Sequence, residues 1–234
     1  MRKVLTVAEM TLRELVRRRR AIAFLLLLPL VFYVVRHEYV GQSVRSLFLG
    51  MGWAVSTAAL FATTAGRTVD PRLVLSGYRA YQVYLGRLFG LWAAGAVLAV
   101  PFLLLIFFDV PGVRFGAVSL GLGFCVAVAA PFGLLIGILL PRELEGTLVL
   151  LTAVSMQMLL DPADALSKVT PFWSSREIGT YAVDHTGSEY LTRGTVHGVA
   201  YTVGLVLLVG LIVAARQRRR RHLRYAPEPE GVRA

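Results

Sequence analysis

The chain has 234 residues, of which 56% are hydrophobic, and its mean hydropathy of +0.64 is well above that of an ordinary soluble domain. Its formal charge of +11 would suit a nucleic-acid-binding protein, but the basic residues lie at the edges of apolar runs, so we expect no nucleic-acid partner. The single cysteine, Cys125, excludes an intrachain disulfide and a cysteine metal cluster. The composition therefore predicts an all-α, polytopic membrane protein.

Residues 1–20 precede the first apolar run and are patterned like a helix. Charged residues occupy one side and apolar residues recur at helical spacing on the other, which predicts an amphipathic helix lying in the membrane interface. The alternative is a polar leader without a fixed structure. The apolar positions are Val4, Leu5, Ala8, Leu12, Leu15 and Val16.

Six apolar runs predict six membrane spans within a transmembrane domain at 21–215. The first is short, and we expect its flanking arginines to snorkel toward the headgroups. The fourth is longer than a crossing requires and contains Pro131, so we expect it to be tilted or broken. Residues 216–234 form a basic tail that we expect to be disordered and to contact anionic lipid. The runs are 21–35, 47–66, 88–108, 113–140, 146–160 and 195–215.

The distribution of basic residues predicts the orientation. With six spans, 19 of the 25 lysines and arginines fall on the side of the N-terminus, and six fall on the other side. Positive charge is retained on the cytoplasmic side of a membrane, so both termini are expected to be cytoplasmic.

A polar segment at 67–87 interrupts the second and third apolar runs and is longer than a simple turn needs. Asp70-Pro71 is typical of a helix start, and Ser76-Gly77 is typical of a helix end. We expect a separate short helix on the cytoplasmic surface, offered to another protein; a solvated interfacial loop is the alternative. Its residues are Asp70, Pro71, Arg72, Leu73, Val74, Leu75 and Ser76.

A second long polar segment, 161–194, carries aromatic residues and prolines on the outer side. Such a composition favours a structure that dips into the interface or folds on it, with Pro171, Phe172 and Trp173 at its centre. An ordinary exposed loop with aromatic anchors is the alternative.

The sequence lacks the residues that catalysis or ion coupling in a membrane needs. No charged side chain lies within the first five spans, and the four histidines are scattered over separate loops and ends, so we expect no catalytic residue and no metal site. A phosphate-binding loop needs a lysine after its glycines, and neither Lys3 nor Lys168 has that context. We expect an enzymatically inactive chain that binds no cofactor and takes any energy from a separate protein.

Uncharged polar and small residues are the remaining candidates for a function in the spans. Hydroxyls and thioethers of the second and fifth spans could line a passage for an amphipathic cargo, although helix packing explains each of them as well. The glycine pairs Gly86/Gly90, Gly133/Gly137 and Gly194/Gly198 are mainly packing signals. The candidate passage residues are Thr57, Phe61, Thr64, Ser155 and Met156.

The order of these segments from residue 1 to about residue 220 resembles the type-2 ATP-binding cassette permeases, the membrane subunits of bacterial drug, antibiotic and polysaccharide exporters. The most specific part of the resemblance is LVLS at 73–76 followed by YLGRL at 84–88, which is similar to the family's loop entering its third span. Haem-export permeases have a similar layout and remain a possibility within this resemblance.

The resemblance implies a multi-pass permease in a bacterial plasma membrane. It implies that residues 1–20 are a connecting helix, that Asp70 to Ser76 is a coupling helix seated in a separate ATPase subunit, and that ATP and magnesium bind to that subunit. It also implies a pair of permeases, as a homodimer or heterodimer, with the second and fifth spans facing a shared cavity below the outer re-entrant segment. The competing hypothesis is a non-transporting membrane scaffold that recruits a cytoplasmic partner.

Overall fold

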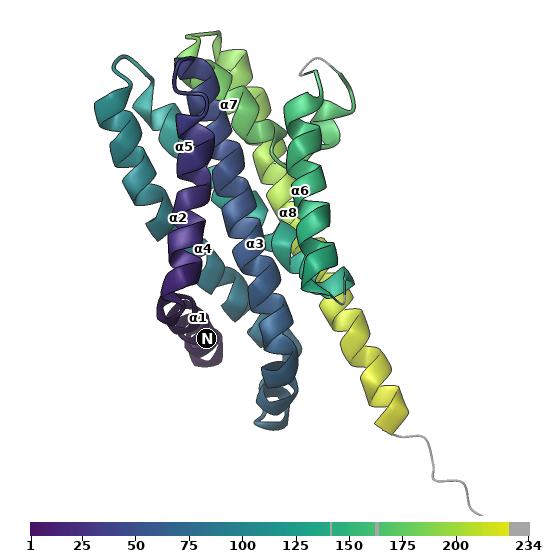
Figure 1. Ribbon diagram of the computed structural model, residues 1–234. Helices are drawn as coiled ribbons and strands as arrows, with labels where there is room; N and C mark the ends of the chain where they lie inside the picture. The colour runs from purple at the N-terminus through teal and green to yellow at the C-terminus, as the bar shows by residue number, and fades with distance from the viewer. Residues whose placement is uncertain (141, 162–163, 225–234) are drawn as a thin grey trace, which may run out of the picture.

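The computed structural model describes residues 1–140, 142–161 and 164–224 (Figure 1). These residues form α-helices and one 3-10 helix, and no strand occurs among them, which confirms the all-α prediction. The elements are α1 (Arg2–Arg17), α2 (Arg19–Val34), α3 (Val40–Leu75), α4 (Ala80–Asp109), α5 (Phe115–Leu139), α6 (Glu143–Leu159), η1 (Ser167–Val169), α7 (Trp173–Val183) and α8 (Ser188–Arg224).

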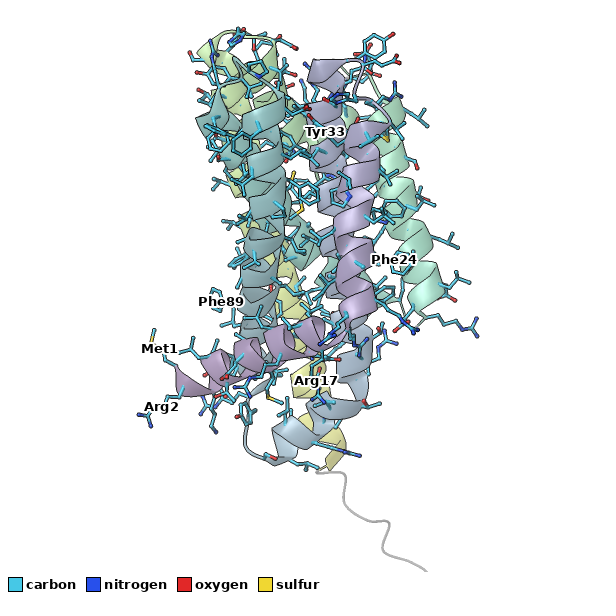
Figure 2. The ribbon with its side chains drawn as sticks, turned by 60° about the vertical axis from the view of Figure 1, so that its left-hand side comes forward. Met1, Arg2, Arg17, Phe24, Tyr33 and Phe89 are labelled. Atoms are coloured by element: carbon cyan, nitrogen blue, oxygen red, sulfur yellow. The ribbon has the colours of Figure 1, made fainter. Side chains whose placement is uncertain are left out.

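The long helices lie lengthwise beside one another in a bundle whose two ends differ (Figure 1). At the end that we call basal, α1 lies across the foot of the bundle, and α3 and α8 extend past it (Figures 1 and 2). At the opposite, distal end, α7 packs against α3, α5 and α8. The chain therefore begins at the same end at which α8 finishes.

Four helices, α3, α4, α5 and α8, are long and apolar enough to span a membrane, which identifies a membrane protein. The apolar runs at 21–35 and 146–160 form α2 and α6, which have only 16 and 17 residues. At 1.5 Å per residue these helices are about 24 and 26 Å long, somewhat less than the hydrocarbon thickness of about 30 Å. Four of the six predicted spans thus lie in helices that satisfy this criterion. The crossings by α2 and α6 remain a prediction.

Several helices are longer than the runs that predict them. The second run, 47–66, lies inside the 36-residue helix α3, and the sixth run, 195–215, lies inside α8. α8 continues as a helix to Arg224, past the predicted start of the tail at residue 216. The rest of the predicted tail, 225–234, lies outside the described residues.

The fourth run forms one unbroken helix, α5, although it contains Pro131. Beyond the proline, α5 packs closely against α3: a Cβ atom on Gly133 would lie 2.1 Å from the Ser56 carbonyl oxygen, and one on Gly137 would lie 2.7 Å from the Thr63 Cβ. The Ser56 hydroxyl also donates to the Ala129 carbonyl at 3.1 Å. The Gly133/Gly137 pair therefore serves packing, as predicted. Of the two alternatives for this span, tilted or broken, the break is absent.

We predict that Gly133→Ala destabilises the protein, because the nearest atom to the new methyl group is backbone and cannot rotate away. The cost should be about 1–3 kcal/mol, as for other overpacked cores, and should lower the midpoint of heat unfolding in detergent. Gly123→Ala is the matched control on the same helix, since a Cβ there meets nothing within 4 Å. Equal midpoints for the two variants would contradict the packing argument.

Candidate functional site

The basal end is built around α1, which lies across α4 (Figure 2). Val7, Ala8 and Thr11 are buried, and Gly86 and Gly90 of α4 allow α1 to approach: a Cβ on Gly86 would lie 2.5 Å from the Val7 Cβ, and one on Gly90 would lie 2.9 Å from the Ala8 carbonyl oxygen. The predicted glycine pair thus receives the amphipathic helix.

The apolar surface of α1 is divided between two directions. Leu5 and Val16, which the sequence pattern assigned to one apolar side together with Ala8, are 67% and 64% exposed. They are eleven residues apart, which places them on one face of the helix beside the face that packs on α4. One face of α1 thus binds the bundle, and an adjacent apolar face remains open to the surroundings.

The segment predicted as a separate coupling helix is the end of α3. No break occurs at Asp70-Pro71, because Pro71 sits inside the helix and the carboxylate of Asp70 points to Arg87 of α4 rather than capping a new helix. Arg87 Nη2 donates to Asp70 Oδ1 at 2.7 Å, and Nη1 donates to Oδ2 at 3.1 Å. The expected separate helix is therefore replaced by a continuous one, held by a bidentate ion pair whose arginine is only 13% exposed.

The predicted end of this helix at Ser76-Gly77 is confirmed. Gly77 has a positive φ of 84°, its N–H donates to the Val74 carbonyl, and the Tyr78 N–H donates to the Leu73 carbonyl, which is the Schellman arrangement. Lys3 of α1 donates from Nζ to the Gly77 carbonyl at 2.8 Å. The tip of α3 is thus attached to both α4 and α1.

Only part of the candidate coupling segment is open to a partner. Leu75 is 74% exposed and Val74 is 42% exposed, whereas Leu73 is partly buried. Arg72, Pro71 and Ser76 are also exposed, and the Ser76 hydroxyl donates to the Arg72 carbonyl. A partner would therefore meet Arg72, Val74 and Leu75, which we call the α3 tip, while Asp70 has a structural role.

The candidate passage residues do not come together within one chain. Thr57 and Phe61 line a cavity of about 410 Å³ between α1, α2, α3 and the start of α6. Thr64 instead donates to Glu143 at the start of α6. Ser155 and Met156 lie near the other end of α6, and Met156 is 40% exposed on the side opposite the buried Val154.

The outer segment is buried at the distal end. Pro171 is buried, and Phe172 and Trp173 are 1% and 6% exposed. Phe172 lies over Gly52 of α3, where a Cβ would be 2.6 Å from the phenylalanine ring, and it makes an edge contact with Phe132 of α5. The three residues therefore belong to the core of the bundle; their depth in a membrane remains a prediction.

Sequence reasoning missed a buried carboxylate beside this segment. Glu177 of α7 is 5% exposed, and Arg193 Nη2 of α8 lies 3.5 Å from its Oε2. Burial raises the pKa of Glu177, while the positive charges of Arg193, Arg176 and Lys168 act in the opposite direction. Its position four residues after Trp173, on the same helical face as that buried aromatic ring, is the signal that could have found it.

Sequence reasoning also missed the arginines that meet helix ends. Arg67 donates to the Gly137 and Leu140 carbonyls, and Arg216 donates to the Ile138 carbonyl, all at the C-terminus of α5. At the distal end, Arg176 donates to the Leu160 carbonyl, which ends α6, and burial lowers the pKa of Arg176 with a further contribution from the charge of Arg45. These guanidinium groups satisfy carbonyls that the last turn of a helix leaves unpaired.

Over the described parts of the chain, no three histidine, cysteine, aspartate or glutamate side chains gather closely enough to hold a metal ion. No family model and no curated protein matches this sequence.

We predict that Asp70→Asn loosens the tip of α3, because charged hydrogen bonds contribute about 1.5–3 kcal/mol each and the contact with Arg87 would lose its negative charge and one of its two acceptor oxygens. Backbone amides at 70–79 should exchange with deuterium at least about tenfold faster, the factor that about 1.4 kcal/mol represents. Arg72→Gln is the control in the same turn, since no carboxylate of the described residues pairs with Arg72. Equal exchange rates in the two variants would show that the ion pair does not hold the end of α3.

We predict that Glu177→Gln changes how stability depends on pH. The pKa of Glu177 is raised in the folded protein, so its contribution to stability is fully present below the ordinary glutamate value of 4.5 and is lost as the pH rises through the folded value. Heat-unfolding midpoints of the two proteins should coincide near pH 4, and the glutamine variant should gain on the wild type as the pH is raised. A constant difference at every pH would contradict the burial of a titrating carboxyl.

Proposed function

We propose that this chain is the membrane permease subunit of an ATP-driven exporter and that it couples to a separate ATPase through the α3 tip. The observation that supports this most is the continuity of α3, which runs without a break from Val40 to Leu75. Thr57 and Phe61, on the wall of the cavity, thus belong to the same helix as the exposed Val74 and Leu75. A helix of this kind joins a docking surface directly to a possible passage.

The proposed coupling is mechanical. Leu75 and Thr57 are 18 residues apart, or about 27 Å along a helix, and helices transmit displacement because their internal hydrogen bonds are stiff. The Asp70–Arg87 ion pair and the Lys3 contact to Gly77 would carry the same movement to α4 and α1. ATP and magnesium would bind to the partner, whose two states must contact the tip differently if they are to shift the permease.

The predicted topology belongs to this proposal. α2 and α6 would cross the membrane as short spans, with Arg17 to Arg20 snorkelling beside α2, to give six crossings and both termini on one side. The basal end carries most of the lysines and arginines and would face the cytoplasm of a bacterial cell.

A second permease copy is the other proposed partner. The outward face of α6 is apolar, with Leu148 54% exposed and Leu159 85% exposed, in addition to Met156. Such a face can meet lipid or a second copy, and in the proposed exporter it would help to close a passage between two permeases, in a homodimer or heterodimer.

We predict that Leu75→Asp abolishes co-purification with the ATPase and the ATP turnover that depends on transport, because it places a charge at the centre of an apolar contact. The partner that we expect is a soluble chain with a phosphate-binding loop, encoded in a neighbouring reading frame, and the measurement uses coexpression with it. Membrane insertion should be unchanged, since Leu75 is largely exposed.

Leu166→Asp is the matched control: Leu166 is 51% exposed at the distal end and should leave the complex and its turnover intact. Retention of complex and transport by Leu75→Asp would refute the coupling role. If the partner that Leu75→Asp releases has no ATPase activity even in the wild-type complex, the result would instead favour the scaffold hypothesis.

A further inference from the structure

The cavity between α1, α2, α3 and α6 has the dimensions of one leaflet's hydrocarbon. Its wall on α2 extends from Arg18, at the start of that helix, to Leu28. Ten residues of helix cover about 15 Å, which is half of the roughly 30 Å hydrocarbon core of a bilayer. With Arg18 at the level of the headgroups, as in the proposed topology, the cavity would reach about to the midplane of the membrane.

The walls and the mouth of the cavity differ in chemistry. Apart from Glu14 and Arg18, the side chains that line it carry no charge, and most are apolar, such as Phe24 and Leu25. Figure 2 shows Phe24 on α2 and Arg17 at the corner below it, where α1 meets α2. The interior therefore favours a hydrocarbon chain, and the mouth favours a polar group.

The charge at the mouth is positive. Glu14 accepts from Arg18 at 2.6 Å, and among the described residues no carboxylate forms an ion pair with Arg17, Arg19 or Arg20. Residues 14–20 thus carry four arginines and one glutamate, of which Glu14 and Arg18 line the cavity. An anion would complement this excess of positive charge.

Two polar atoms on the wall lack a partner. The indole Nε1 of Trp53 and the hydroxyl of Thr57 are buried, and neither is hydrogen-bonded to any described residue. Each of the two atoms is itself covered by protein, so it adds a local cost to the wall and is not open to an occupant of the cavity.

We propose that this cavity binds an anionic phospholipid from the leaflet beside the basal end, with an acyl chain between α2 and α3 and the phosphate at the arginine corner. The site does not depend on ATP-driven transport, because a single chain without any partner contains every residue that forms it. Failure of the coupling experiment would therefore leave this proposal intact, and failure of the lipid experiment would leave the coupling role intact.

The test measures lipid retained by the purified full-length chain, by native mass spectrometry during titration with phosphatidylglycerol, phosphatidylcholine or free glycerol phosphate. We expect one phosphatidylglycerol per chain at concentrations where the other two probes do not bind. Arg18→Gln should weaken its binding about fivefold, the factor expected for one arginine at a membrane surface. Ala62→Phe, which fills the cavity from the wall of α3, should abolish it.

Two matched controls separate this site from general lipid contact. Arg13 pairs with Glu9 through the same i,i+4 spacing on α1 but does not line the cavity, and Ala93 is exposed on α4 away from it. Arg13→Gln and Ala93→Phe should bind as the wild type does. The proposal would be overturned if both arginine variants weakened lipid binding equally, or if only free glycerol phosphate were bound. It would also be overturned if Ala62→Phe changed the dimer fraction without changing the bound lipid, because the cavity would then belong to the contact with a second copy.

Discussion

The unpaired carbonyls at the ends of helices are the constraint on which the arrangement of this bundle depends. The carbonyls of the last turn have no partner within the helix, so a buried helix end must lie where another part of the chain can donate. Arginines from distant segments do this: Arg67 and Arg216 at the end of α5, Arg176 at the end of α6, and Arg114, which donates to Tyr181 and Thr186 beside the end of α7. Because each of these arginines lies outside the helix whose carbonyls it meets, the contacts link the ends of neighbouring elements.

Between the two ends, the bundle is held by close packing. Lipid chains are as apolar as leucine, so helices in a membrane gain little from hydrophobic burial against each other and depend on shape and on hydrogen bonds. The contact of Gly133 with the Ser56 carbonyl and the hydrogen bond from Ser56 to Ala129 bring α3 and α5 backbone to backbone. α3 also packs against α2, α4, α6 and α7, which makes it the common axis of the structure. A movement of α3 would therefore be felt by every helix around it.

The sequence could predict those features that local chemistry determines. Apolar runs identified the helices, Ser76-Gly77 located the end of α3, and the Gly86/Gly90 pair marked the surface that receives α1. It could not predict the continuity of α3 through Asp70-Pro71, because the same two residues favour a helix start unless Arg87, 17 positions away, takes the carboxylate. The sequence could not predict the burial of α7 either. Ser174, Ser175 and Glu177 would suit a solvated helix, and only contacts such as that of Cys125 with Ser175 show that its polar face is inside.

The weakest element is α6, and its position bears on the proposed transport. Gln157 is 2% exposed, and neither of its amide atoms has a partner among the described residues, which costs about 1–3 kcal/mol for each unsatisfied group. Few other residues of α6 are buried. Gly146 packs against Leu60, and Leu150 lies in a small apolar cluster with Leu60 and Ile136. A displacement of α6 would break few contacts and could give Gln157 a partner. Since Thr147 at its start forms part of the cavity wall, the same displacement would change the opening through which a lipid or a cargo enters.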